Sequence, residues 1–367
     1  MKKTLYLATS ILFLTLALVS CSGGGGNSND NNNNNLPIGS RHDVYVAGFS
    51  EAGHIANPIL WKNGNPTALN ARSGLSATPF SVFVSGNDVY VAGYEGIYSD
   101  SHDFPLFWKN DIRQSLSLGE LSTAGAYSIF VSNNDVYVAG GGYTRYGPRR
   151  ALVWKNGVQN WLQTSDSARD AFAQSIFVSG NDVYVAGCEA DYYNNDSVAI
   201  LWKNGRPYVL SDSGGRNFYG DLTYNAANSV YVSYNDVYVA GNVTNSSNHN
   251  FVATLWKNGV AQNLTDGNYD AYAYSVFVSG NDVYVAGCES NAQGKVAAKL
   301  WKNGTAQNLS GNDAVAVSVY VLGNDVYVAG VEYDLYGRNT ARLWKNGTAQ
   351  SLGSASGNTT ALSVFVK

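Results

Sequence analysis

The chain has 367 residues, of which 45% are hydrophobic and only 14% are charged, and its formal net charge is −4. This apolar content is sufficient for a large core, and nowhere do basic residues gather into a stripe. The composition therefore argues against a nucleic-acid-binding protein, which would carry a basic surface.

Residues 1–20 have the organisation of a secretory signal peptide, with two lysines before an apolar run from Leu5 to Val19. The run ends in Leu18-Val19-Ser20-Cys21, which resembles the lipobox of bacterial lipoproteins. The resemblance implies cleavage before Cys21 and lipidation of that residue, so that a lipid anchors the mature protein to a membrane. A plain cleaved signal and an uncleaved anchor helix are the alternatives.

Residues 21–40 begin with the expected lipidation site, Cys21, and continue with a segment rich in Gly, Asn and Ser that predicts a disordered tether. As a flexible coil, such a tether spans roughly 25 Å. The expected location is the bacterial cell envelope, and Ser22 favours the outer membrane. The sequence does not indicate which face of the membrane carries the protein.

From residue 41 to 367 the chain repeats one unit, of which Ala173 to Leu210 is an example. Its runs Ser175–Val178 and Val183–Ala186 are short, β-branched and aromatic, as strands are, and a hairpin-length connection joins them. A third strand, Val198–Lys203, ends at Asn204-Gly205, a pair that favours a type I′ turn into a short fourth strand. Each unit therefore predicts four antiparallel strands.

The unit occurs seven times, with an Asp at the start of each second strand and a Trp in each third strand. The spacing between successive Asp residues is 43 to 54 residues. Four-stranded repeats of this length are typical of β-propeller blades, and a Trp at one fixed place suits packing between blades. The sequence predicts an all-β fold, a seven-bladed β-propeller of four-stranded antiparallel blades. The marker residues are Asp43, Asp88, Asp135, Asp182, Asp236, Asp282 and Asp325, and Trp61, Trp108, Trp154, Trp202, Trp256, Trp301 and Trp344.

The two ends of the repeat region complement each other. The first repeat lacks its first strand, and the chain ends on an isolated first strand, Leu362–Lys367. We expect the C-terminal strand to pair with the N-terminal blade, because the pairing removes two exposed sheet edges. We also expect a monomer.

The long connections, from second to third strands and from each fourth strand to the next blade, fall on one face of the disc because neighbouring strands are antiparallel. Variable loops on a rigid scaffold often carry function, so this loop face is the candidate working surface. Tyrosine-rich loops suit polar, flat ligands, although packing of the loops is the alternative role of each ring. The candidate binding residues are Tyr98, Tyr143, Tyr146, Tyr192, Tyr193, Tyr219, Tyr272 and Tyr336.

A second pattern is a glutamate two residues after the glycine that follows the second strand. Equivalent positions in a ring of blades predict an incomplete acidic ring, which would attract cations or amines. The alternative is charge placed where strands emerge into water. The candidate acidic ring comprises Glu95, Glu189, Glu289 and Glu332.

Templates for catalysis and for metal or cofactor binding are absent from the sequence. None of the four histidines has metal-ligand spacing to another, and no nucleophile elbow or phosphate-binding glycine loop occurs. We therefore expect no cofactor, no metal site and no catalysis. Cys188 and Cys288 stand at equivalent positions two blades apart, too far for a disulfide, and are interpreted as small buried residues. The repeated Asp is interpreted as stabilising its hairpin through nearby backbone.

The run A-x-L-W-K-N-G followed by Leu, S-V-F-V and a glycine-ended strand resembles bacterial extracellular repeats of the HAF type, over about residues 43 to 367. The resemblance implies a secreted or envelope protein and assigns no site residues. We hypothesise a non-catalytic module whose loop face binds an envelope glycan, peptide or protein. The alternatives are an enzyme acting on polysaccharide or peptidoglycan through loop-face carboxylates, and a purely structural surface protein.

Overall fold

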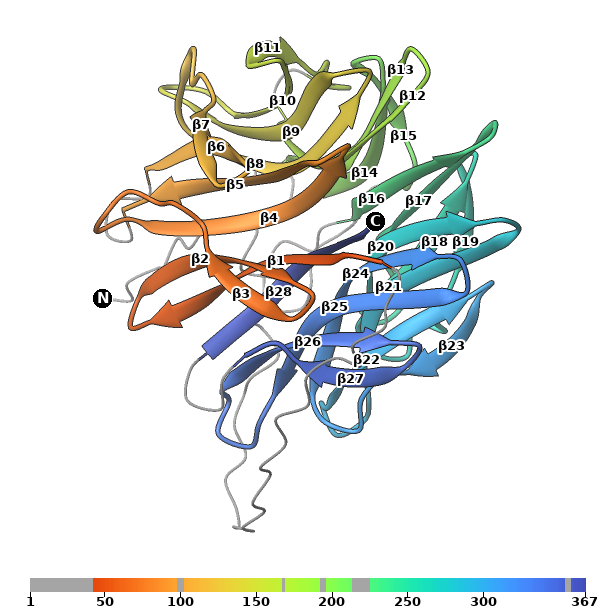
Figure 1. Cartoon of the computed structure of the whole chain (residues 1–367). Helices are drawn as coiled ribbons and strands as arrows, with labels where there is room; N and C mark the ends of the chain where they lie inside the picture. Colours follow the sequence, from red (N-terminus) through yellow and green to blue (C-terminus); the bar gives the residue numbers. More distant parts are fainter. Residues whose placement is uncertain (1–41, 98–101, 167–168, 192–195, 213–224, 354–357) are drawn as a thin grey trace, which may run out of the picture.

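A computed structural model describes residues 42–97, 102–166, 169–191, 196–212, 225–353 and 358–367. The expected signal peptide, Cys21 and the tether lie outside these residues. All the regular elements described are strands, and they form seven four-stranded antiparallel sheets. Figure 1 shows these sheets following one another around a common centre as the blades of a propeller. The predicted fold is confirmed.

Each blade has a first, second, third and fourth strand, counted outward from the axis of the ring. The first strand lies innermost, because the first strands of neighbouring blades contact one another. The first strands are β4 (Ser76–Ser85), β8 (Leu121–Ser132), β12 (Asp170–Ser179), β16 (Ala226–Ser233), β20 (Ala271–Ser279), β24 (Ala314–Leu322) and β28 (Asn358–Val366). The second strands are β1 (Val44–Ala52), β5 (Asp88–Gly96), β9 (Asp135–Thr144), β13 (Asp182–Asp191), β17 (Asp236–Thr244), β21 (Asp282–Ser290) and β25 (Asp325–Tyr333).

The third strands carry the tryptophans, and the four-residue fourth strands form the outer edges. The third strands are β2 (Ile55–Lys62), β6 (Asp103–Lys109), β10 (Arg149–Lys155), β14 (Asp196–Lys203), β18 (Phe251–Lys257), β22 (Val296–Lys302) and β26 (Asn339–Lys345). The fourth strands are β3 (Asn65–Ala68), β7 (Ile112–Ser115), β11 (Val158–Trp161), β15 (Arg206–Val209), β19 (Val260–Asn263), β23 (Thr305–Asn308) and β27 (Thr348–Ser351).

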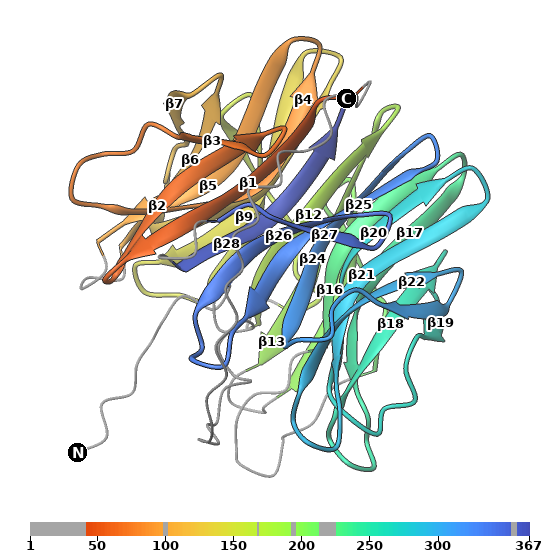
Figure 2. The same ribbon diagram turned by 60° about the horizontal axis from the view of Figure 1, so that its bottom comes forward.

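The ring closes as expected, through the sheet order β28-β1-β2-β3. The C-terminal β28 pairs antiparallel with the N-terminal β1 from Val44↔Val366 to Glu51↔Asn358. Figure 1 and Figure 2 both show the two ends of the colour scale side by side in this blade. Residues more than 300 positions apart in the sequence therefore complete one sheet.

The seven predicted tryptophans are all at most 1% exposed and lie in the apolar layers between blades. Trp202 of β14, for example, packs in one cluster with Ala139 and Val153 of the preceding blade. The indole N–H of Trp202 donates to the carbonyl of Gln163, at 2.7 Å, in the connection that enters its own blade. Burial of a large ring at each interface stabilises blade against blade.

Two rings of contacts, which the sequence analysis did not anticipate, join the first strands around the axis. In each blade the backbone N–H that follows a serine donates to the equivalent serine hydroxyl of the neighbouring blade, at 3.1–3.2 Å. Two residues further along, seven aromatic side chains contact one another in a closed ring, with centroids 4.6–5.0 Å apart. These rings are Phe83, Phe130, Phe177, Tyr231, Phe277, Tyr320 and Phe365. The seventh member of each ring comes from β28.

The repeated Asp has a different role from the one expected. In the blade of β12–β15, Asp182 accepts from Lys203 Nζ at 2.8 Å, from Asn204 Nδ2 at 2.7 Å and from the Tyr184 hydroxyl at 3.3 Å. Asn204 Oδ1 in turn accepts from the Val183 N–H at 2.8 Å. The Asp thus ties the second strand to the turn after the third strand through side chains. The interpretation that its side chain bonds backbone in its own hairpin was wrong, because the carboxylate accepts from the side chains of Lys203, Asn204 and Tyr184 instead. The same Asp–Lys–Asn–Tyr clasp recurs in all seven blades.

The Asn-Gly turns have the left-handed backbone that the sequence predicts, for example φ 52° at Asn204 and 79° at Gly205. In one blade Asp111 replaces the glycine and still has φ 65°. Its carboxylate accepts from the Asn70 N–H at 2.6 Å, in the connection that enters the same blade, a contact that a glycine could not make.

Candidate functional site

Two candidate tyrosines project from the loop face into solvent. Tyr146, between β9 and β10, is 94% exposed, and Tyr336, between β25 and β26, is 80% exposed. Each ring has a guanidinium nearby, Arg145 at 6.0 Å and Arg338 at 5.5 Å from the respective centroids. Tyr143, near the end of β9, is also exposed. These rings are available to a partner.

The other candidate tyrosines are placed differently. Tyr272 lies within β20 instead of in a loop, because that strand begins at Ala271, and its ring packs between Phe251 and Tyr274 at 5.0 and 5.9 Å. It is a packing residue, and its expected place in a surface loop is corrected. The remaining candidates lie outside the described residues: Tyr98, Tyr192, Tyr193 and Tyr219.

The four candidate glutamates do not gather around the axis, because they belong to second strands whereas the first strands surround the axis. Each one has its own partners. Glu289 pairs with Lys299 at 2.8 Å and Glu332 pairs with Arg342 at 2.5 Å. Glu95 and Glu189 are fully buried. The alternative interpretation, charge exposed to water at the ends of strands, also does not describe these two buried carboxylates.

The glutamates hold the connections that enter their blades. Glu189 accepts from the backbone N–H of Ser165, at 2.9 Å, and from its hydroxyl. Glu332 accepts from the Ser310 hydroxyl at 2.5 Å and from Asn312 Nδ2 at 3.1 Å. Each contact fixes a connecting segment on the loop face.

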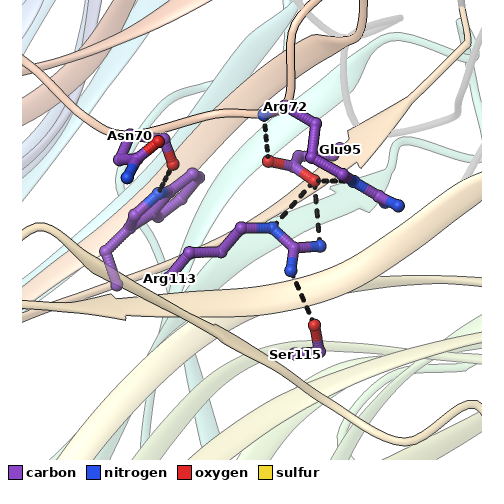
Figure 3. A network of polar contacts seen from close by, with 6 residues as sticks. Asn70, Arg72, Glu95, Arg113 and Ser115 are labelled. Carbon is purple, nitrogen blue, oxygen red and sulfur yellow. Dashed lines mark hydrogen bonds and ion pairs between the residues drawn. The ribbon is translucent and has the colours of Figure 1, made fainter.

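Around Glu95 this arrangement is elaborated into a charged network, shown in Figure 3. Glu95 Oε1 accepts from the Arg72 N–H at 2.9 Å, and Oε2 accepts from Arg72 Nε at 2.8 Å. Oε2 also accepts from Nε and Nη2 of Arg113, each at 2.9 Å. Arg113 Nη1 donates to Ser115 Oγ at 2.7 Å. Two guanidinium groups therefore share one buried carboxylate, and the network carries a net positive charge.

This network borders a hollow of about 210 Å³ on the loop side of the blade. The Arg72 guanidinium lies 4.9 Å from the centroid of the Phe104 ring. None of the residues around the hollow is acidic. The lining residues are Arg72, Phe104, Pro105, Arg113, Ser115, Leu116 and Leu118.

The sequence analysis singled out Glu95 and missed both arginines. A signal for Arg113 was present, because in the strand register it is the partner of Trp108, a position that is Pro, Gln or Ala in the other six blades. The equivalent residues are Pro66, Gln159, Pro207, Ala261, Ala306 and Ala349. Arg72 lies in a connection without a fixed register, so its approach to Glu95 could not be read from spacing.

A second group of charged residues surrounds Arg149, at the start of β10. Its backbone N–H donates to Asp170 Oδ1 at 2.7 Å, its Nη2 donates to the Tyr127 hydroxyl at 2.6 Å, and its guanidinium lies 4.2 Å from the Phe172 ring. Burial raises the pKa of the nearby Asp103 carboxyl to about 6, and burial also raises the pKa of Asp170. Arg149 itself is only 5% exposed.

Cys188 and Cys288 are buried free thiols, as interpreted, and burial raises the pKa of each to about 12. Within the described part of the chain, no three His, Cys, Asp or Glu side chains are grouped to hold a metal ion. In the same part, no helix has the length and apolar character needed to cross a bilayer.

No family model matches the chain, and neither does any curated protein. Among solved structures, the β-propeller domain of the Trilobed protease from Pyrococcus furiosus, described as having an open velcro topology, is similar with a TM-score of 0.54 and 8% identity over 86% of this chain and 93% of that one. A puromycin-hydrolysing peptidase from Mycobacterium tuberculosis has a TM-score of 0.53 and 10% identity over 84% of this chain, and a puromycin hydrolase has a TM-score of 0.54 and 11% identity over 86%. This chain spans only 53% and 52% of the length of those two enzymes. At such identities the likeness shows the fold, a seven-bladed β-propeller, and nothing of the activity.

Proposed function

We propose that the protein is a lipid-anchored lipoprotein of the bacterial cell envelope, related to extracellular HAF-type repeats, whose loop face binds a glycan, peptide or protein without catalysis. The observation that carries the binding role is the exposure of Tyr146 and Tyr336 beside arginines on connections of a rigid scaffold. Exposed Tyr–Arg pairs are typical of the residues that dominate binding interfaces. The opposite face instead carries the repeated clasps, in which the lysines are already paired.

The binding role is tested with glycan and peptide arrays and with pull-downs from envelope extracts. Tyr146→Ala and Tyr336→Ala should each weaken the signal that the wild-type protein gives. Tyr234→Ala is the matched control, because Tyr234 is 92% exposed but lies in a hairpin turn on the opposite face. Empty arrays and pull-downs, or equal losses in all three variants, would contradict the proposal.

The anchor is tested separately with Cys21→Ser, which should release the protein from the membrane fraction into the soluble fraction. A variant that stays in the membrane fraction and is still processed would contradict lipidation at Cys21.

The alternative, an enzyme acting on polysaccharide or peptidoglycan, rests on the group around Arg149, where Asp103 and Asp170 both have raised pKa values. Against it, the guanidinium lies among aromatic rings and Arg149 is largely buried. If the enzyme hypothesis holds, the protein hydrolyses such polymers and Asp103→Asn abolishes the hydrolysis. A wild-type protein without hydrolytic activity excludes this alternative.

A further inference from the structure

The two arginines beside Glu95 exceed what the fold requires. Glu189 holds the equivalent connection in another blade through the N–H and hydroxyl of Ser165, and the position of Arg113 is taken there by Pro207. In two further blades a glutamate is matched one to one by Lys299 or Arg342. Among the described residues, only the blade of β4–β7 has two guanidinium groups on one carboxylate. The second guanidinium is therefore not needed to hold the connection.

The excess charge is available to a ligand. Arg72 uses its backbone N–H and Nε on Glu95, and neither of its Nη nitrogens has a protein acceptor among the described residues. Its side chain is 47% exposed, whereas Glu95 is fully covered. The outer edge of a guanidinium presents two parallel donors that fit a carboxylate.

The other residues around the hollow indicate which chemical group a bound carboxylate ligand carries next to its carboxylate. Four of the lining residues are apolar: Phe104, Pro105, Leu116 and Leu118. The one uncharged polar residue, Ser115, already accepts from Arg113 at its hydroxyl oxygen. A sugar acid would bring several hydroxyl groups to a hollow in which four of the seven lining residues offer them no hydrogen bond from a side chain. An apolar side chain beside the carboxylate fits these walls.

We infer that this hollow binds the C-terminal carboxylate of a peptide or protein that ends in an apolar residue. The volume of about 210 Å³ is below the range of drug-sized pockets, which suits a single terminal residue. Arg72 receives the carboxylate, Arg113 and Glu95 hold Arg72 in place, and Phe104 and the leucines contact the side chain. The inference rests on the proposed function and names the chemistry of the partner that the loop face binds.

In the test, N-acetyl-leucine is titrated into the folded protein, and NMR measures its binding. It should bind in the millimolar range, and N-acetyl-leucinamide, which lacks the carboxylate, should bind at least about tenfold more weakly. N-acetylglycine should also bind more weakly, because it lacks the apolar side chain. Arg72→Gln should weaken binding of N-acetyl-leucine about tenfold while Arg113 still pairs with Glu95. Arg206→Gln, at an exposed arginine that begins β15 next to the turn on the opposite face, is the control and should bind like the wild type.

Several outcomes would overturn the inference. Equal binding of the acid and the amide, unchanged binding by Arg72→Gln, or no saturable binding would each exclude a carboxylate site here. Galacturonate binding as tightly as N-acetyl-leucine would assign the hollow to acidic glycans instead. Thermal midpoints of both variants within about 2 °C of the wild type show that a loss of binding is not a loss of folding. The Tyr146 and Tyr336 variants test the loop-face proposal independently, so one can fail without the other.

Discussion

At the scale of single residues, the tryptophans determine how strongly neighbouring blades adhere. Trp202 is fully buried between two blades, and its N–H donates to the Gln163 carbonyl. Trp202→Ala should therefore lower the free energy of unfolding by about 3–5 kcal/mol, through lost apolar contacts and a cavity. Denaturant unfolding measures this change, and a loss below about 1 kcal/mol would show that the ring is not wedged between blades.

The seven tryptophans also supply a matched comparison. Trp301 is equally buried, but its indole nitrogen has no hydrogen-bond partner among the described residues. Substitution by Phe removes the N–H at either site, and only at Trp202 does it leave a carbonyl without its donor. Trp202→Phe should therefore be more destabilising than Trp301→Phe by about 1 kcal/mol in unfolding titrations. Equal losses would mean that the bond to Gln163 does not contribute.

At the scale of the blade, the Asp–Lys–Asn–Tyr clasp makes stability depend on acid pH. Hydrogen bonds from Lys203 and then Asn204 lower the pKa of Asp182, and the equivalent Asp is shifted in the same direction in all seven blades. A folded-state pKa below the unfolded value of 3.8 gives stability that is present above about pH 4 and is lost as pH falls through the folded pKa. The clasps are exposed, so each contribution is small and salt-sensitive.

The expected result is a thermal midpoint that falls as pH decreases from about 4.5 to 2.5. Asp182→Asn should lower the midpoint at pH 7 and make its decline below pH 4 less steep. Glu120→Gln, at an exposed carboxylate with no ion pair among the described residues, should leave both unchanged. Asp103 has the opposite sign, because its raised pKa makes protonation below about pH 6 favour the folded state. The comparison of variants separates the two effects, and parallel curves for wild type and Asp182→Asn would contradict the role of the clasp.

The sequence predicted the four-stranded blades and their closure because strand periodicity, Asn-Gly turns and a regularly repeated Trp are local signals. The clasp was misinterpreted because Asp182 and Asn204 are 22 positions apart, and only the register between β13 and β14 brings them together. The candidate acidic ring was expected from equivalent positions alone, without the partners that each glutamate has. Arg72 was out of reach for the same reason, since a connecting segment has no periodicity from which its neighbours follow.

At the scale of the whole molecule, closure occurs at the axis as well as in the completed blade. The serine ring and the aromatic ring each need β28, which supplies Ser363 to the Val82 N–H and Phe365 between Phe83 and Tyr320. The same strand completes the sheet of β1. Loss of one short segment therefore opens both rings of contacts and removes a strand from the sheet of β1, and an open ring exposes the first strands of two blades.

Deletion of residues 362–367 should accordingly lower the thermal midpoint by well over 5 °C and broaden the transition, because blades next to the gap can then unfold before the others. Removal of Lys367 alone is the control, since it keeps Ser363 and Phe365 and loses only contacts at the strand end, including those of Lys367 with Asp43 and Gly86. Phe365→Ala should fall between the two, because it opens the aromatic ring while β28 still pairs with β1. Calorimetry on the three variants measures this order. If the six-residue deletion melted like the control, the blades would hold the ring together without its closing strand.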